Sequence, residues 1–136
     1  MITMSSNKVE KILAKLAPLI HQLDPKHVVT QSDSSYSLHS ETYAVHKNLH
    51  PAVVLAPETA QTLATIVRFL YETDLDFAIR GRGYKSPSAY DVIISMLNFD
   101  TFEYDSSLKL ATVGVGLNWV QLAAFMERED PEYCGI

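Results

Sequence analysis

The sequence predicts an α/β (α+β) fold, a small mixed sheet with a β-α-β unit and flanking helices. Two short apolar runs, Val53–Leu55 and Asp76–Ile79, have the β-branched and aromatic composition of buried strands. Between them, apolar residues recur with helical spacing at Leu63, Ile66, Val67 and Leu70. Because that stripe is typical of a helix packed on a sheet, strand, helix and strand form one β-α-β unit, for which we expect a right-handed crossover.

The amino-terminal segment predicts an amphipathic helix that packs against this sheet. Its stripe comprises Val9, Ile12, Leu13, Leu16, Leu19, Ile20 and Leu23. Pro18 falls inside the helix and is expected to kink or divide it before the chain breaks near Asp24-Pro25. A membrane-surface helix is the alternative interpretation, and it is the rarer use of such a stripe.

A serine-rich stretch, residues 31–40, predicts a surface connection. It separates an amino-terminal helix and linker, residues 1–34, from a domain over residues 35–136. The histidines in and after it, His39, His46 and His50, raise the question of a metal site. Because no carboxylate follows at a useful spacing and no H-E-x-x-H is present, we expect none.

The helix at Leu63 has Thr59 as its predicted N-cap, with Glu58 favourably placed at its positive end. Later in the chain, Asp91–Met96 predicts another strand, and residues 101–104 and 108–113 predict a hairpin joined to a mixed sheet. Asn118 then caps a last helix that begins at Trp119. We expect that tryptophan to lie in the core rather than to serve as a ligand platform.

Composition excludes several classes of protein. The 136 residues suffice for one domain with a core, and 47% hydrophobic content is that of a globular chain. Eleven basic against sixteen acidic residues, with no basic stripe, argue against nucleic-acid binding. The single cysteine, Cys134, precludes an internal disulfide and a cysteine metal cluster. No secretion leader and no membrane-spanning run are recognisable, so we expect a cytoplasmic protein without a membrane partner.

The segment after Ile79 is the candidate ligand loop. It follows the carboxyl end of a predicted parallel strand, where open α/β sheets bind their ligands. Gly81 and Gly83 allow close approach of the backbone, and Arg80, Arg82 and Lys85 add positive charge. A diphosphate suits such a loop, although an ordinary glycine-rich turn with solvated charges remains the alternative. Neither G-x-G-x-x-G nor a P-loop motif is present.

Four ordered blocks together resemble the FAD-linked oxidase family, the vanillyl-alcohol-oxidase and berberine-bridge-like group, especially its fungal members. The blocks are Pro51–Pro57, Ala78–Gly83, Val92–Met96 and Ala111–Trp119. The resemblance runs from about Tyr36 onward and implies that the chain holds the first subdomain of a PCMH-type FAD-binding domain, with FAD as cofactor. It implies that the FAD diphosphate is bound by Arg80, Gly81, Arg82, Gly83, Tyr84, Lys85 and Ser86.

The chain departs from that family in its loop. Members usually carry Gly-Gly-His there, and in many of them this histidine holds the flavin covalently. Counting from Arg80 places Tyr84 at the histidine position, whereas counting back from Ser86-Pro87 places Lys85 there. The connection from Pro87 to Asp91 is also shorter than in the family. We therefore expect FAD to be bound non-covalently and weakly, if the loop binds it.

A second departure is that the family continues into another glycine-rich stretch and a substrate domain that are not recognisable here. We therefore expect an FAD-dependent oxidoreductase that is truncated or is one half of a split enzyme, completed by a complementary chain or by self-association. Its catalytic residues cannot be assigned. The alternative is a non-catalytic binding or scaffold module that kept the fold without flavin chemistry.

Overall fold

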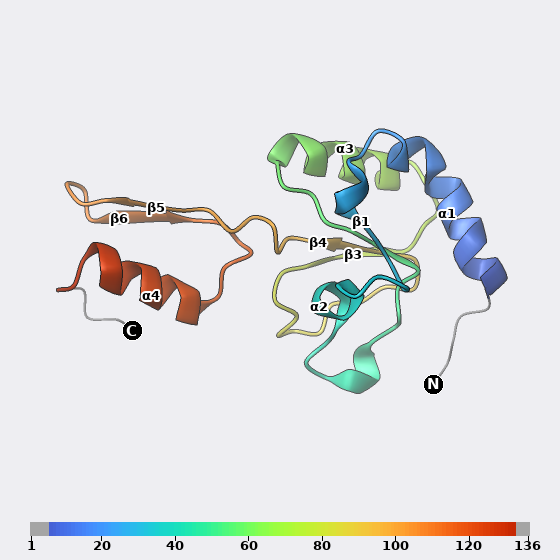
Figure 1. Cartoon of the computed structure of the whole chain (residues 1–136). Coiled ribbons are helices and arrows are strands. Elements are labelled where there is room, and N and C mark those ends of the chain that lie inside the picture. The colour runs from blue at the N-terminus through green and yellow to red at the C-terminus, as the bar shows by residue number, and fades with distance from the viewer. Residues whose placement is uncertain (1–5, 133–136) are drawn as a thin grey trace.

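The computed structural model describes residues 6–132, so Cys134 lies outside the described part of the chain. The helices are α1 (Ser6–Ile20), α2 (Tyr36–Ser40), α3 (Ala60–Tyr71) and α4 (Trp119–Glu129). The strands are β1 (Val28–Thr30), β2 (Val53–Leu55), β3 (Phe77–Arg80), β4 (Val92–Ser95), β5 (Phe102–Asp105) and β6 (Leu110–Val113). The α/β class predicted from the sequence is confirmed (Figure 1).

The main sheet has four strands in the order β1-β2-β4-β3. Strands β2, β4 and β3 are parallel, while β1 runs antiparallel to β2 and pairs Val29 with Val54. The sheet is therefore small and mixed, as predicted. Strand β3 occupies one edge and not the interior, because β4 inserts between β2 and β3.

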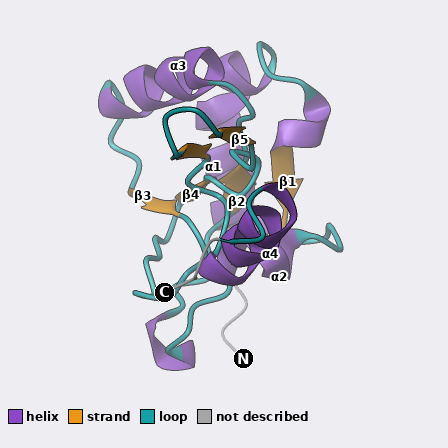
Figure 2. Cartoon of the chain, turned by 90° about the vertical axis from the view of Figure 1, so that its left-hand side faces the viewer, coloured by secondary structure: helices purple, strands orange, loops and turns teal. Residues whose placement is uncertain are grey.

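Helices cover both faces of this sheet, which is why every residue of β2 and β4 is buried. On one face, Val53, Leu55, Val92 and Ile94 pack with residues of α1 and α3. On the other face, Val29, Val54 and Ile93 pack with Tyr36 of α2. Figure 2 shows α3 and α2 on opposite sides of the strands. The amino-terminal helix thus packs on the sheet as expected from its stripe, and it continues through Pro18 to Ile20.

The hairpin β5–β6 forms a second, separate sheet that projects from the first with α4 against it (Figure 1). The rings of Phe102 and Phe125 stack at 5.0 Å between centroids. At the far end, Tyr104 Oη and Lys109 Nζ donate to Asp130 Oδ2 at 2.6 and 3.0 Å. The prediction that this hairpin joins the mixed sheet was wrong, because the main sheet becomes mixed through β1 instead.

Three further expectations need correction. Residues 31–40 are not wholly a surface connection, because α2 forms there and buries His39 and Ser40. Ile79 is 52% exposed, since β3 is an edge strand. Trp119, the first residue of α4, is 72% exposed and does not lie in the core; Met126 is the buried residue of that helix.

Both predicted helix caps are confirmed. Thr59 Oγ1 accepts the N–H of Thr62 at 3.1 Å, and Asn118 Oδ1 accepts the N–H of Gln121 at 2.8 Å. The Gln121 side chain in turn accepts the N–H of Asn118, which completes a capping box. Among residues 6–132, no helix is long and apolar enough to cross a membrane. The domain boundary near residue 34 and the handedness of the β2-α3-β3 crossover stay predictions.

Candidate functional site

The loop at the carboxyl end of β3 presents a run of unused backbone donors. Within the described residues, none of the N–H groups of residues 81–85 donates a hydrogen bond to a protein acceptor. Gly83 has φ of 82°, and Ser86 closes the loop with φ of 56°. A side chain on Gly81 would meet only Val115 O, at 3.8 Å. Consecutive free N–H groups beside a left-handed residue form a concavity that suits an anion.

Backbone bonds hold this loop against the segment 41–44. Gly83 O accepts the N–H of Ser86 at 2.9 Å and that of Tyr43 at 3.3 Å. The buried hydroxyl of Ser86 accepts the N–H of Ala44 at 2.8 Å. Ser86 is therefore a structural closure of the loop, and its oxygen is occupied by the protein rather than free for a ligand.

Arg80 is a buried support beneath the loop. Its Nε donates to Glu41 O at 3.0 Å and its Nη1 donates to Gly81 O at 3.1 Å. Burial lowers the pKa of this guanidinium, and the neighbouring charge of Arg82 lowers it further, while Glu41 acts in the opposite direction. A Cβ on Gly83 would lie 2.9 Å from the backbone oxygen of Glu41, and φ is 82°, so this position requires glycine.

Arg82 reaches in the other direction, toward α4. Its Nε donates to Gly116 O at 2.8 Å and its Nη2 donates to Gln121 Oε1 at 2.7 Å. The sequence pattern did not indicate this link, because the partners lie more than 30 residues away. The positive charge stays near the loop, and two of the five N–H donors of the guanidinium are already used by the protein.

Tyr84 and Lys85 are exposed at the tip of the loop. Neither side chain makes a hydrogen bond or an ion pair within residues 6–132. Both are therefore accessible from solvent. The seven predicted residues therefore comprise the last residue of β3 and the loop after it. The side chains of Arg80, Arg82 and Ser86 bond to the protein, whereas Tyr84, Lys85 and the backbone N–H groups of residues 81–85 are open.

Below the loop, the carboxyl end of β4 carries a buried pair. Nδ1 of His39 lies 2.7 Å from Ser95 Oγ, and both side chains are buried. Burial lowers the pKa of His39, and the nearby charge of Arg80 lowers it further. His39 therefore lies beside Arg80 and, through its contact with Ser95, joins α2 to the end of β4. Among residues 6–132, no group of three potential metal ligands comes together.

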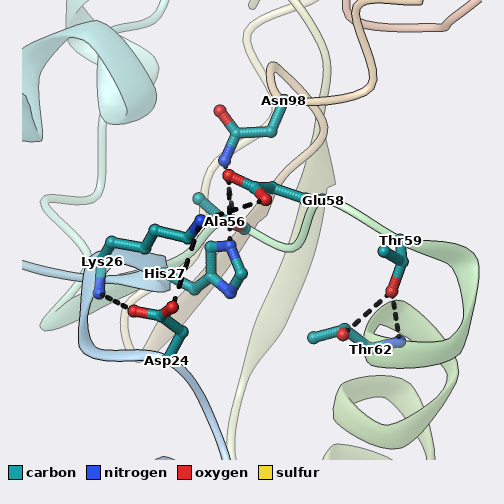
Figure 3. Close-up of polar contacts among 8 residues, drawn as sticks. All are labelled: Asp24, Lys26, His27, Ala56, Glu58, Thr59, Thr62 and Asn98. Carbon is teal, nitrogen blue, oxygen red and sulfur yellow. Dashed lines mark hydrogen bonds and ion pairs between the residues drawn. The ribbon is translucent and has the colours of Figure 1, made fainter.

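A polar cluster fastens β1 to the start of α3, as Figure 3 shows. Lys26 Nζ lies 3.3 Å from Glu58 Oε2, and His27 Nε2 lies 3.4 Å from Glu58 Oε1. These two neighbours hold the pKa of Glu58 below its usual value. Asn98 Nδ2 donates to Ala56 O at 2.9 Å, which joins the ends of β4 and β2. These contacts brace the carboxyl ends of β2 and β4, while the loop follows β3 at the edge opposite β1.

A shallow apolar groove of about 230 Å³ adjoins the loop. Val113, Val115 and Trp119 line it, and Val115 O is the atom nearest to the missing side chain of Gly81. All four residues of β6 are exposed, and β5 is its one strand partner in the described chain. The groove and the free edge of β6 therefore form one open face beside the loop.

Comparison with known proteins identifies relatives of the chain. A family described as "FAD binding domain" matches residues 51–130. The FAD-dependent monooxygenase yanF of Aspergillus niger is 23% identical over 94 residues, which cover 65% of this chain and 16% of that protein.

Solved structures share the fold. Wild-type BBE-like 1 of Physcomitrella patens has a TM-score of 0.64 at 19% identity, over 89% of this chain and 26% of that chain. Xylooligosaccharide oxidase of Myceliophthora thermophila C1 has a TM-score of 0.69 at 12% identity, over 89% and 25%. Wild-type Phl p 4.0202, a glucose dehydrogenase, has a TM-score of 0.70 at 13% identity, over 87% and 27%.

The chain spans about a quarter of the length of these solved structures and 16% of the monooxygenase. The family match extends over more than half of the chain and includes the whole loop after β3. The free N–H groups and the two glycines of that loop suit the diphosphate of the cofactor. The resemblance seen in the sequence is therefore confirmed: the chain belongs to the FAD binding domain family, whose cofactor is FAD.

Proposed function

We propose that this chain forms part of an FAD-dependent oxidoreductase and that its loop after β3 binds the diphosphate of FAD. The observation that carries the proposal is the run of free N–H groups over residues 81–85. Gly83, within this run, has a left-handed backbone conformation with φ of 82°. Backbone donors of this kind bind phosphate oxygens without a side chain. Tyr84 and Lys85 border the mouth of the loop, and the ammonium of Lys85 adds a positive charge.

Arg80 and Ser86 contribute to the same site indirectly. They hold the loop through Glu41 and Ala44, so their substitution displaces the donors rather than removing a ligand contact. Arg80 also leaves a buried positive charge under the loop, which favours an anion above it. The seven residues 80–86 therefore act as one anion-binding unit, with the backbone as the contacting surface.

When bound, FAD supplies hydride acceptance, and the reduced flavin passes its electrons to oxygen. The substrate is an alcohol, an amine or an activated carbon. No residue of this chain is assigned to substrate chemistry, because the chain spans only a quarter of the solved relatives. In this proposal the residues described here bind and orient the cofactor.

The cofactor is held without a covalent bond and weakly. The loop has no imidazole, and Tyr84 and Lys85 offer a phenol and an ammonium in its place. Contacts through the backbone N–H groups of this loop, at about 1 kcal/mol each, supply modest affinity by themselves.

The open face beside the loop is the proposed contact with a complementary chain, and with a second copy when the chain is alone. It combines the free edge of β6 with exposed apolar side chains of the hairpin and α4. These are Leu108, Leu110, Val113, Val115, Trp119 and Val120. Because an unpaired strand edge and exposed apolar side chains both favour association, we expect a polypeptide to cover them.

The proposed diphosphate site is tested by titrating the full chain with FAD, ADP and riboflavin in a calorimeter. FAD and ADP should bind, and riboflavin, which lacks the diphosphate, should bind at least tenfold more weakly. Inorganic pyrophosphate should displace ADP. Equal binding of riboflavin and FAD would show that the ring rather than the diphosphate is recognised. No binding of either nucleotide would favour the non-catalytic module.

A further inference from the structure

Arg82 lies between the two glycines of the ligand loop, and its side chain makes a specific bridge. The guanidinium leaves the ligand loop and donates to Gly116 O at 2.8 Å and to Gln121 Oε1 at 2.7 Å. Gly116 lies in the turn before α4, and Gln121 lies in its first turn. One side chain of the loop is therefore joined to two points around the start of α4.

The Gln121 acceptor is shared. Its Oε1 also accepts the N–H of Asn118 at 3.0 Å, and this contact is half of the capping box that begins α4. The bond from Arg82 carries a formal charge, which makes it shorter and stronger than a bond between neutral groups. The position of Arg82 and the geometry of the α4 cap therefore depend on the same oxygen atom.

The opposite side of the loop is held by other contacts. Arg80, Ser86 and Gly83 O fasten it to the segment 41–44. On the α4 side, Arg82 supplies the side-chain hydrogen bonds between the loop and the start of that helix within residues 6–132. Without Arg82, the free N–H groups at residues 81–85 would be held from one side alone.

We propose that Arg82 is a positioning residue for the anion loop. It holds the loop through Gly116 and Gln121 so that the free N–H groups point to one place, and it does not itself have to contact the bound anion. This inference rests on the proposed diphosphate site. It extends that proposal by making anion affinity depend on Gln121, a residue of α4 outside the predicted site.

The test measures the affinity of the full chain for inorganic pyrophosphate by calorimetry. Arg82→Gln should weaken binding about tenfold or more, since both bridging bonds are lost or misplaced. Gln121→Leu, which keeps the charge of Arg82 and removes its partner, should weaken binding in the same direction. Arg82→Lys should restore part of the affinity, because an ammonium can reach one acceptor but not present the fork.

The control is Arg68→Gln, which removes the same charge from an exposed position on α3 without a described side-chain hydrogen bond. It should bind pyrophosphate within about twofold of the unmodified chain, since exposed distant charges are screened. Circular dichroism and the emission of Trp119, the single tryptophan, check that each variant keeps its fold. The double variant of Arg82→Gln and Gln121→Leu should be no weaker than Arg82→Gln alone.

Two outcomes would overturn the positioning role while leaving the proposed function intact. The first is Arg82→Gln binding pyrophosphate as tightly as Arg68→Gln. The second is Gln121→Leu binding like the unmodified chain while Arg82→Gln does not, because the anion affinity would then not depend on the bridge to Gln121. An unmodified chain that binds neither pyrophosphate nor FAD would overturn the proposed function and this inference together.

Discussion

Nδ1 of His39 and Oγ of Ser95 lie 2.7 Å apart, both buried, at the point where α2 meets the carboxyl end of β4. The charge of Arg80 lies close enough to lower the pKa of His39 beyond the effect of burial. A neutral imidazole is thus built into the support beneath the ligand loop, which makes the stability of the fold depend on pH.

The pH prediction follows from the direction of that shift. Because the folded pKa of His39 is lowered, the unfolded chain takes up a proton first, near its ordinary value of about 6.5. This contribution to stability is full above that pH and is lost as the pH falls below it. Thermal melts at pH 7.5 and 5.5 should show a smaller drop for His39→Asn than for the unmodified chain. His21→Asn, on the exposed surface, should retain the full drop.

Gly83 should not accept a side chain. Gly83→Val forces a β-branched residue to φ of 82° and places its Cβ 2.8 Å from Arg80 Nη2 and 2.9 Å from Glu41 O. We expect a loss of at least about 2 kcal/mol in unfolding free energy, together with loss of ADP binding. Gly81→Ala is the matched control, since its Cβ meets only Val115 O at 3.8 Å and should cost less than about 1 kcal/mol. Equal urea midpoints for the two variants would contradict this role of Gly83.

The cap of α3 should contribute measurably to stability. Thr59→Ala removes the oxygen that accepts the N–H of Thr62 and should cost about 1 kcal/mol in a urea denaturation experiment. Thr65→Ala, inside the same helix, removes a hydroxyl that bonds only to Gln61 O and should change stability by less than about 0.5 kcal/mol. A cost for Thr65→Ala as large as that for Thr59→Ala would refute the cap assignment.

Flavin bound to the chain should dissociate on denaturation. Absorbance near the flavin bands should appear in the supernatant after acid precipitation and not in the pellet, because the loop offers Tyr84 and Lys85 in place of an imidazole. Dialysis of the native protein should remove the colour as well. Yellow protein in the acid pellet would show a covalent link and would overturn this interpretation of the loop.

The free edge of β6 should cause self-association. Light scattering of the purified chain should give a mass that rises with concentration, and Leu110→Lys should lower it toward the monomer by placing a charge on the strand edge. Leu38→Lys is the matched control, because Leu38 on α2 is also 60% exposed but lies on the other part of the fold. A strictly monomeric unmodified chain at every concentration would contradict the prediction.

Much of the fold was predictable because local patterns were strong. The stripe of α3, the apolar run of β4 and the caps at Thr59 and Asn118 each carry a short-range signal, and each is confirmed. Strand β1 was not predicted, since three residues after a 3-10 turn contain too little periodicity. Its place is fixed by pairing with β2, which is a tertiary interaction.

The errors at Ile79 and Trp119 have a common cause. Both are large apolar residues with the spacing of core positions. Composition alone cannot show that β3, which contains Ile79, lies at an edge of the sheet, or that the groove lined by Trp119 and by Val113 of β6 is open. For the candidate site, the sequence predicted a loop after β3 but not the contacts made within it. That Arg80 and Arg82 bond to protein carbonyls became visible only from distances between remote segments.

Strand β4 is the last of the four sheet strands to be synthesised, yet it lies between β2 and β3. Until Val92–Ser95 has left the ribosome, β2 and β3 have no shared partner, and the nascent chain can form only the β1–β2 pair. The apolar strand β2 therefore has no partner on the side that β4 later occupies while about 40 further residues are synthesised. Because unpaired strand edges favour aggregation, the pairing of β4 is the step that protects the growing polypeptide.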